Sequence, residues 1–95
     1  MNWTKPRQAG ESALMGTMHF EQIDPRRNRA RFYRLEIRRT LFDELVVIKC
    51  WGRVGYDGRR REWRVRDVVE AVALVEAEAR KRIRRGYRCV QQSIP

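Results

Sequence analysis

The hydrophobic pattern of this chain changes its period once, and that change limits the folds open to it. Between about residues 17 and 66, apolar and polar residues alternate in several short runs, whereas from residue 68 to 83 apolar residues recur every three to four positions. A period of two is typical of half-buried strands, and a period near 3.6 is typical of an amphipathic helix. The pattern predicts an α+β fold, a small twisted antiparallel sheet of about four to five strands with one C-terminal helix packed on one face.

The expected strands are short runs separated by turn residues. We predict strands at residues 17–23, 31–39, 45–51, 59–66 and 87–90. In the second run Tyr33, Leu35 and Ile37 alternate with charged residues and are expected to face the core. The third run is apolar on both faces, and there Lys49 and Trp51 share a side.

Two connections carry residues that favour turns. Residues 24–28 read Asp-Pro-Arg-Arg-Asn, in which Pro fixes φ while Asp and Asn bond back to nearby backbone. Residues 52–58 hold three glycines and an Asp57-Gly58 hairpin signal. Their spacing differs from the GxGxxG of dinucleotide-binding folds, and the GxxG loop of KH domains joins two helices, whereas a strand precedes Gly52. We therefore expect a twisted hairpin connection whose missing side chains let a backbone approach a ligand.

The helix has signals at both ends. Asp67 followed by Glu70 resembles a capping box, and Gly86 stands where a C-terminal glycine is expected. Arg84 and Arg85 suit the negative end of the helix dipole. The stripe expected to face the sheet consists of Val68, Val72, Val75, Ala79 and Ile83.

Length and charge bound the class of protein. The 95 residues suit one domain, expected at residues 17–95, with residues 1–16 as a flexible arm. Lys and Arg number 22 against 12 Asp and Glu, so the net charge of +10 favours a polyanionic partner. No run approaches the ~20 apolar residues of a membrane span, and residues 1–18 lack the pattern of a signal peptide. With two cysteines and no disulfide framework, we expect a cytoplasmic protein, with association with the nucleoid as a further option.

Few residues are suited to catalysis or to metal binding. His19 is the single histidine, and Cys50 and Cys89 lack the spacing of a metal knuckle, so a triad or a zinc site has too few members. Both cysteines are expected to pack as small apolar residues. Asp67 and the Asp43-Glu44 pair are better explained by cap and turn roles. We therefore predict a protein that is not an enzyme and that needs no metal or cofactor.

The most specific local feature is Trp51-Gly52-Arg53 at the end of a strand. A Trp beside a glycine and an arginine offers a flat plate for a sugar or base next to a fork for phosphate. Strand alternation alone equally allows Trp51 to be an anchor of the core. Two basic clusters follow this motif in sequence, at residues 59–66 and 80–88. Whether they form one surface is left open by the sequence.

These motifs together resemble the WGR domain, a module found in poly(ADP-ribose) polymerases and in short bacterial proteins. The resemblance rests on the runs at residues 31–35 and 51–55 and on a helix that ends at Gly86-Tyr87, and it covers about residues 17–90. Asp24-Pro25, Asn28 and Leu41-Phe42 are similar to the bacterial branch. The resemblance implies a small antiparallel sheet with one helix, and DNA binding, which in the polymerases occurs near strand ends. It further implies that Trp51 packs on the sugar-phosphate backbone, that Arg53 contacts DNA or a partner domain, and that Arg82 is a basic contact.

We therefore predict a nucleic-acid-binding module that contacts the sugar-phosphate backbone of DNA. Strand ends and nicks are candidate targets, and the sequence does not distinguish DNA from RNA as the partner. The predicted site residues are Trp51, Gly52, Arg53, Arg59, Arg60, Arg82, Arg85 and Tyr87. The alternative is a protein-interaction adaptor that docks a partner domain through the same surface.

Overall fold

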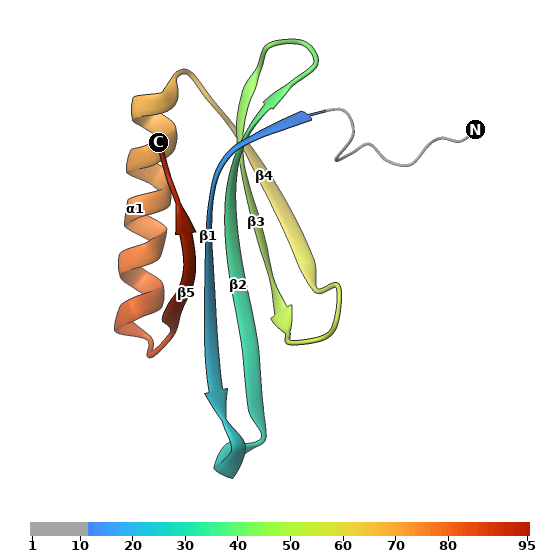
Figure 1. Cartoon of the computed structure of the whole chain (residues 1–95), viewed down its shortest axis with the longest axis vertical. Helices are drawn as coiled ribbons and strands as arrows, with labels where there is room; N and C mark the ends of the chain where they lie inside the picture. The colour runs from blue at the N-terminus through green and yellow to red at the C-terminus, as the bar shows by residue number, and fades with distance from the viewer. Residues whose placement is uncertain (1–11) are drawn as a thin grey trace, which may run out of the picture.

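A computed structural model describes residues 12–95, and within them five strands form one antiparallel sheet beside an α-helix (Figure 1). The elements are β1 (Ser12–Asp24), the short 3-10 helix η2 (Pro25–Arg27), β2 (Arg29–Thr40), β3 (Leu45–Arg53), β4 (Arg59–Val65), α1 (Val68–Arg84) and β5 (Arg88–Ser93). The strand order is β4-β3-β2-β1-β5, so the chain returns after α1 to pair its last strand with its first. The predicted α+β fold is confirmed.

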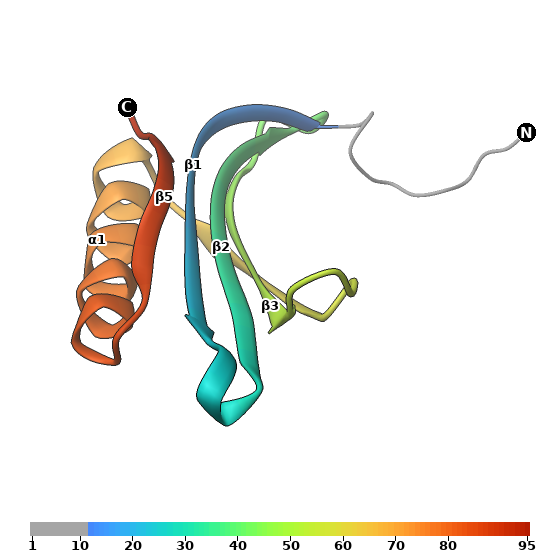
Figure 2. The same ribbon diagram turned by 60° about the horizontal axis from the view of Figure 1, so that its bottom comes forward.

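The first strand is longer than the sequence pattern predicted. It begins at Ser12 rather than Thr17, because Ser12 and Ala13 already pair with Thr40 and Arg39 of β2. A shift of register between Leu14 and Gly16 marks a bulge, and bulges bend the strand that carries them. Figure 2 shows β1 and β2 bending over the face of the sheet that lies away from α1. Residues 1–11, the rest of the expected arm, lie outside the described residues.

Alternation along the strands decides which side chains meet the helix. Leu35 and Ile37 are fully buried, and Ile37 pairs with the buried Val47 of β3, so these strands present their core residues to the same side. The core between sheet and helix consists of Met18, Phe20, Tyr33, Leu35, Ile37, Leu45, Val47, Ala71, Val75 and Ala79. The faces predicted for β2 and β3 are thereby confirmed.

Both ends of α1 are capped near the predicted residues. The Asp67 carboxylate accepts a hydrogen bond of 2.8 Å from the backbone N–H of Glu70. The Glu70 carboxylate reaches back one residue further than in the usual box and accepts from the backbone N–H of Arg66 at 2.7 Å. At the other end Gly86 has φ +89°, and the N–H of Tyr87 donates to the carbonyl of Arg82 at 3.0 Å. The left-handed glycine therefore ends the helix as predicted.

One member of the predicted helix stripe is wrong. Ile83 is 57% exposed, whereas Ala71, which the stripe omitted, is fully buried. Each step of four residues advances about 40° around a helix of 3.6 residues per turn. The run from Val75 through Ala79 to Ile83 therefore turns away from the sheet, and polar side chains of the last two turns face it instead.

A second apolar cluster lies on the sheet face that α1 leaves uncovered. It consists of Phe32, Val46, Ile48 and Cys50. Cys50 is buried there as predicted, but Cys89 is exposed on β5, so the same prediction is wrong for Cys89. Among residues 12–95 no helix is long and apolar enough to cross a membrane. Nor does that part of the chain gather three His, Cys, Asp or Glu side chains in an arrangement that holds a metal ion.

Candidate nucleic-acid interface

Cross-strand pairing places basic side chains on the sheet face that α1 partly covers. Directly paired residues of an antiparallel ladder point to the same face. Tyr33, which faces the helix, pairs with Trp51, and Trp51 in turn pairs with Arg59. Lys49 lies two residues before Trp51 and pairs with Arg61. These basic residues therefore share the side of Trp51.

Lys49 is surrounded by aromatic rings. Its Nζ lies 5.1 Å from the ring centroid of Trp51, 5.1 Å from that of Trp63 and 5.6 Å from that of Tyr33. At such distances the negative faces of the rings attract the ammonium. The side chain of Lys49 is 20% exposed, so its charge is held at the surface by its packing rather than left to move in solvent.

One carboxylate from the helix connects this group to α1. Glu78 accepts a hydrogen bond of 2.6 Å from the Tyr33 hydroxyl, and its oxygens lie 3.3 Å from Lys81 Nζ and 3.9 Å from Lys49 Nζ. Burial raises the pKa of Glu78, but the bonds from Tyr33 and Lys81 and the charge of Lys49 outweigh it and hold that pKa below its ordinary value. Burial and the bond to Glu78 raise the pKa of Tyr33, which therefore remains a donor.

The end of the helix completes the group. The Arg82 guanidinium lies over Tyr33 at 4.3 Å and over Tyr87 at 5.5 Å, and the two tyrosine rings meet edge to face at 6.3 Å. Among the described residues, Arg82 Nε has no hydrogen-bond partner. We call the whole group the cation–aromatic layer, and its members are Tyr33, Lys49, Trp51, Trp63, Arg82 and Tyr87.

Positive charge dominates around this layer. The pKa of Lys49 lies below its ordinary value, chiefly because the side chain is partly buried. The Glu78 carboxylate raises this pKa, whereas the charges of Arg82, Arg61 and Lys81 lower it. The charged groups that act on Lys49 are thus three cations and one carboxylate, so an anion placed beside Lys49 would be attracted. Arg61 comes from the hairpin and Lys81 from the helix, so the two basic clusters that the sequence left apart meet at Lys49.

Comparison of the sequence with known protein families identifies the family of this chain. The sequence model of the WGR domain matches residues 16–94. This chain belongs to the WGR family. WGR domains are in general modules of the nucleic-acid-binding type. An uncharacterised protein, y4dW, of Sinorhizobium fredii (strain NBRC 101917 / NGR234) is 34% identical over 71 residues, which are 75% of this chain and 35% of that protein. The match thus spans about a third of the relative's length. No solved structure matches the chain.

The three residues of the Trp-Gly-Arg motif in this WGR domain make different contacts. Trp51 lies half-buried in the cation–aromatic layer. A Cβ on Gly52 would lie 2.8 Å from the Cα of Gly58, so Gly52 allows two backbones of the same hairpin to approach closely. Arg53 is exposed and donates two bonds of 3.3 Å to the carbonyl and the side-chain oxygen of Asn28. It therefore ties the end of β3 to the β1–β2 turn.

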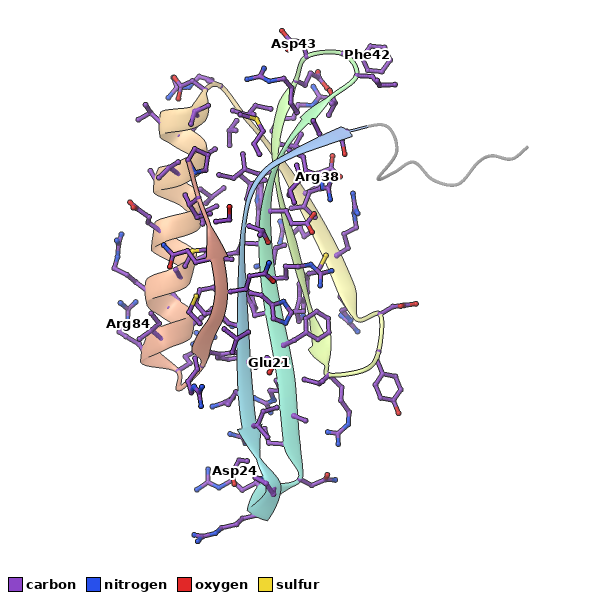
Figure 3. The ribbon with its side chains drawn as sticks, in the orientation of Figure 1. Glu21, Asp24, Arg38, Phe42, Asp43 and Arg84 are labelled. Atoms are coloured by element: carbon purple, nitrogen blue, oxygen red, sulfur yellow. The ribbon has the colours of Figure 1, made fainter. Side chains whose placement is uncertain are left out.

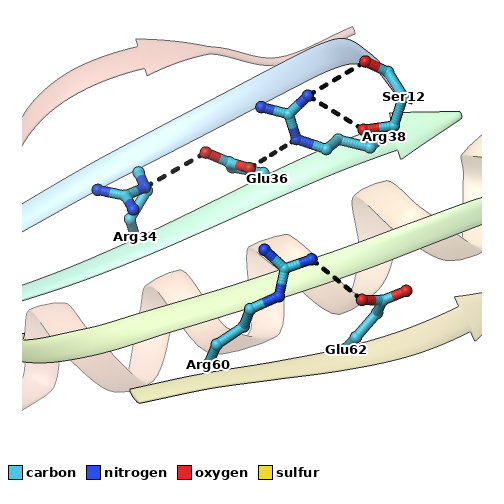
Figure 4. Close-up of polar contacts among 6 residues, drawn as sticks. All are labelled: Ser12, Arg34, Glu36, Arg38, Arg60 and Glu62. Atoms are coloured by element: carbon cyan, nitrogen blue, oxygen red, sulfur yellow. Dashed lines mark hydrogen bonds and ion pairs between the residues drawn. The ribbon is translucent and has the colours of Figure 1, made fainter. Parts of the chain in front are cut away.

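The remaining predicted residues are divided between the two faces. Arg59 shares the side of Trp51, whereas Arg60 points to the opposite face, where it lies 3.2 Å from Glu62 (Figure 4). Arg85 is exposed at the end of α1, and its carbonyl accepts a bond from Gln22. The structure adds residues that the predicted site lacked, chief among them Lys49. Alternation had placed Lys49 beside Trp51, and that was the signal available in the sequence.

Proposed function

We propose that this WGR domain binds DNA along the sugar-phosphate backbone and carries out no catalysis itself. The observation that supports the proposal is that strand register and helix end bring their basic side chains together around Trp51, with Glu78 as the carboxylate among them. Guanidinium and ammonium groups bind phosphate oxygens without reading bases. The proposed contact residues are Lys49, Trp51, Arg53, Arg59, Arg61, Arg82, Arg85 and Tyr87.

Adjacent arginines of β4 offer a matched test, because Arg59 and Arg60 point to opposite faces. Arg59→Gln is expected to weaken binding to a short duplex by about 1–2 kcal/mol, roughly five- to thirtyfold, since a bond to a charged phosphate is lost. Arg60→Gln carries the same change of charge and is expected to bind like the parent. Fluorescence anisotropy with a labelled duplex, a nicked duplex, single-stranded DNA and RNA measures both variants.

Equal losses in the two variants would contradict the site, because only net charge would then matter. Binding of RNA in preference to every DNA would move the proposal to RNA with the same residues. If no nucleic acid binds even at low salt, the proposal fails, and the adaptor that docks a partner protein through this surface replaces it.

A further inference from the structure

The sheet face away from α1 forms a groove that nucleic-acid binding through the cation–aromatic layer does not use. It encloses about 790 Å³. Its floor includes Val46 and Ile48, each 3% exposed, and Cys50, 9% exposed. The bend of β1 and β2 over this face makes it concave (Figure 2).

Charged side chains form the walls of the groove and are already paired with one another. Glu36 lies 2.8 Å from Arg38 Nε and 3.3 Å from Arg34 Nε, and Arg60 lies 3.2 Å from Glu62 (Figure 4). The aliphatic stems of such long side chains cover apolar surface while their heads stay in water. Because these charges have partners, covering them costs less than covering single charges.

The groove is electrically balanced, unlike the rest of the protein. Its lining residues include three arginines and three glutamates, Arg34, Arg38, Arg60, Glu36, Glu44 and Glu62. The chain as a whole carries +10. A polyanion therefore gains little by binding here. A second copy of so basic a chain meets less repulsion at this face than at the basic surface around Lys49, and arginines of one copy can oppose glutamates of the other.

An exposed apolar knob stands at one end of the groove. Phe42 is 86% exposed and Leu41 is 73% exposed, and both line the groove from the β2–β3 turn. Thr40 Oγ1 holds the turn by accepting bonds from the N–H groups of Phe42 and Glu44 at 3.3 and 3.1 Å. Figure 3 shows Phe42 at the tip of this turn, beyond the strand ends. The same face thus carries both a protrusion and a recess.

We propose that this face binds a second copy of the chain in a two-fold dimer, in which Phe42 of each copy enters the groove of the other. A two-fold interface must be self-complementary, and a face that carries a knob, a recess and balanced charges meets that condition. Four strands at ~4.8 Å spacing and nine residues of length offer on the order of 600 Å² per copy. That area is somewhat below the ~800 Å² per partner of a standard interface, a size at which weak, reversible contacts are common.

Mass in solution tests the dimer. Light scattering on the full chain from about 1 to about 500 µM, which brackets a weak interface of this size, should show a rise from 11.5 kDa toward twice that mass. Phe42→Glu should stay at the mass of one chain. The matched control is Val69→Glu, which makes the same kind of change at a side chain of α1 that is 78% exposed. It should dimerise like the parent. A parent that stays monomeric throughout, or a Phe42→Glu variant that still dimerises, overturns the proposal.

A photo-crosslinking phenylalanine analogue at position 42 then identifies the occupant of the groove. We expect covalent dimers with links to residues 44–50 or 60–62 of the second chain. Links within a single chain to residues 1–11 would overturn the proposal, because the chain's own N-terminal segment would then occupy the groove. The Phe42→Glu variant should also bind a duplex long enough for only one copy of the protein, with the same affinity as the parent. A loss of that binding would overturn the assignment of the two faces to separate roles.

Discussion

Trp51 lies at the edge of the core, packed against the cluster beneath α1, and Lys49 Nζ is 5.1 Å from the centroid of its ring. The sequence offered an exposed plate or a core anchor as alternatives. Its intermediate burial combines the two, because the ring both packs on the core and helps to hold a cation at the surface. Trp63 on β4 holds Lys49 at the same distance, so the ammonium has two supports.

Trp51→Ala is therefore expected to affect both binding and stability. Loss of the ring should weaken DNA binding by about 1–3 kcal/mol, the range for a lost stacking surface. The free energy of unfolding should fall by less than the ~3–5 kcal/mol of a fully buried aromatic residue. Titration with a labelled duplex and a thermal melt on the same preparation measure the two effects.

Trp63→Ala is the matched control for that substitution. It removes a ring of the same kind from the same face and should lower stability to a similar degree. Its effect on DNA binding should be smaller, because Trp63 pairs with Val47 and so lies further from Arg53 and the hairpin end of β3. A folded Trp51→Ala variant with the affinity of the parent would exclude Trp51 from the site.

The helix α1 has different tasks along its length. Its first turns supply Ala71 and Val75 to the core, both fully buried. Toward the end of the helix, polar side chains meet the sheet beside the buried Ala79. Glu78 accepts a bond from Tyr33, and Arg82 rather than Ile83 lies over the Tyr33 ring. Arg84, in the same turn as Arg82, points away from the sheet (Figure 3). One element thus anchors the fold at its start and presents cations at its end.

Two substitutions on α1 separate these tasks. Val75→Asp should unfold the domain or lower its unfolding free energy by several kcal/mol, because it buries an unpaired carboxylate. Ile83→Asp should cost no more than about 1 kcal/mol, the effect of an acidic residue near the negative end of a helix dipole. Thermal melts followed by circular dichroism measure both. A strongly destabilised Ile83→Asp variant would show that the exposed placement of Ile83 is wrong.

The molecule as a whole has two unlike faces. One side of the sheet carries α1 and the cation–aromatic layer, with Arg61 and Lys81 close to Lys49. The other carries a groove whose walls hold equal numbers of arginines and glutamates. A chain with a net charge of +10 is therefore not uniformly basic, and its two faces are suited to different partners.

The salt dependence of DNA binding follows from this distribution. If the basic side neutralises about six to eight phosphates, the logarithm of the association constant should fall with the logarithm of salt concentration at a slope of about −5 to −7. Titrations at four or more salt concentrations give the slope. Arg59→Gln should reduce the magnitude of the slope by about one, the contribution of a single phosphate contact. A slope near zero would contradict backbone contacts by this many cations.

Much of the fold was predictable because its signals are local. Alternation placed Tyr33 and Leu35 toward the core, since successive strand residues point to opposite faces whatever surrounds them. Asp67 and Gly86 marked the ends of the helix because capping depends on the backbone of one turn. The WGR motif indicated the family for the same reason, as a run of neighbouring residues.

Other features depend on how distant segments pack, and there the sequence pattern was insufficient. The side of α1 that meets the sheet depends on where the helix lies across the strands, and so Ile83 was misplaced. Lys49 shares its surroundings with Glu78 and Arg82 only because β3 lies beneath the last turns of α1. The groove arises where β1 bends at its bulge and brings Ser12 and Thr40 to one rim. Periodicity is a property of the backbone of each segment, whereas these sites arise from contacts between segments, which are set by the packing of the whole chain.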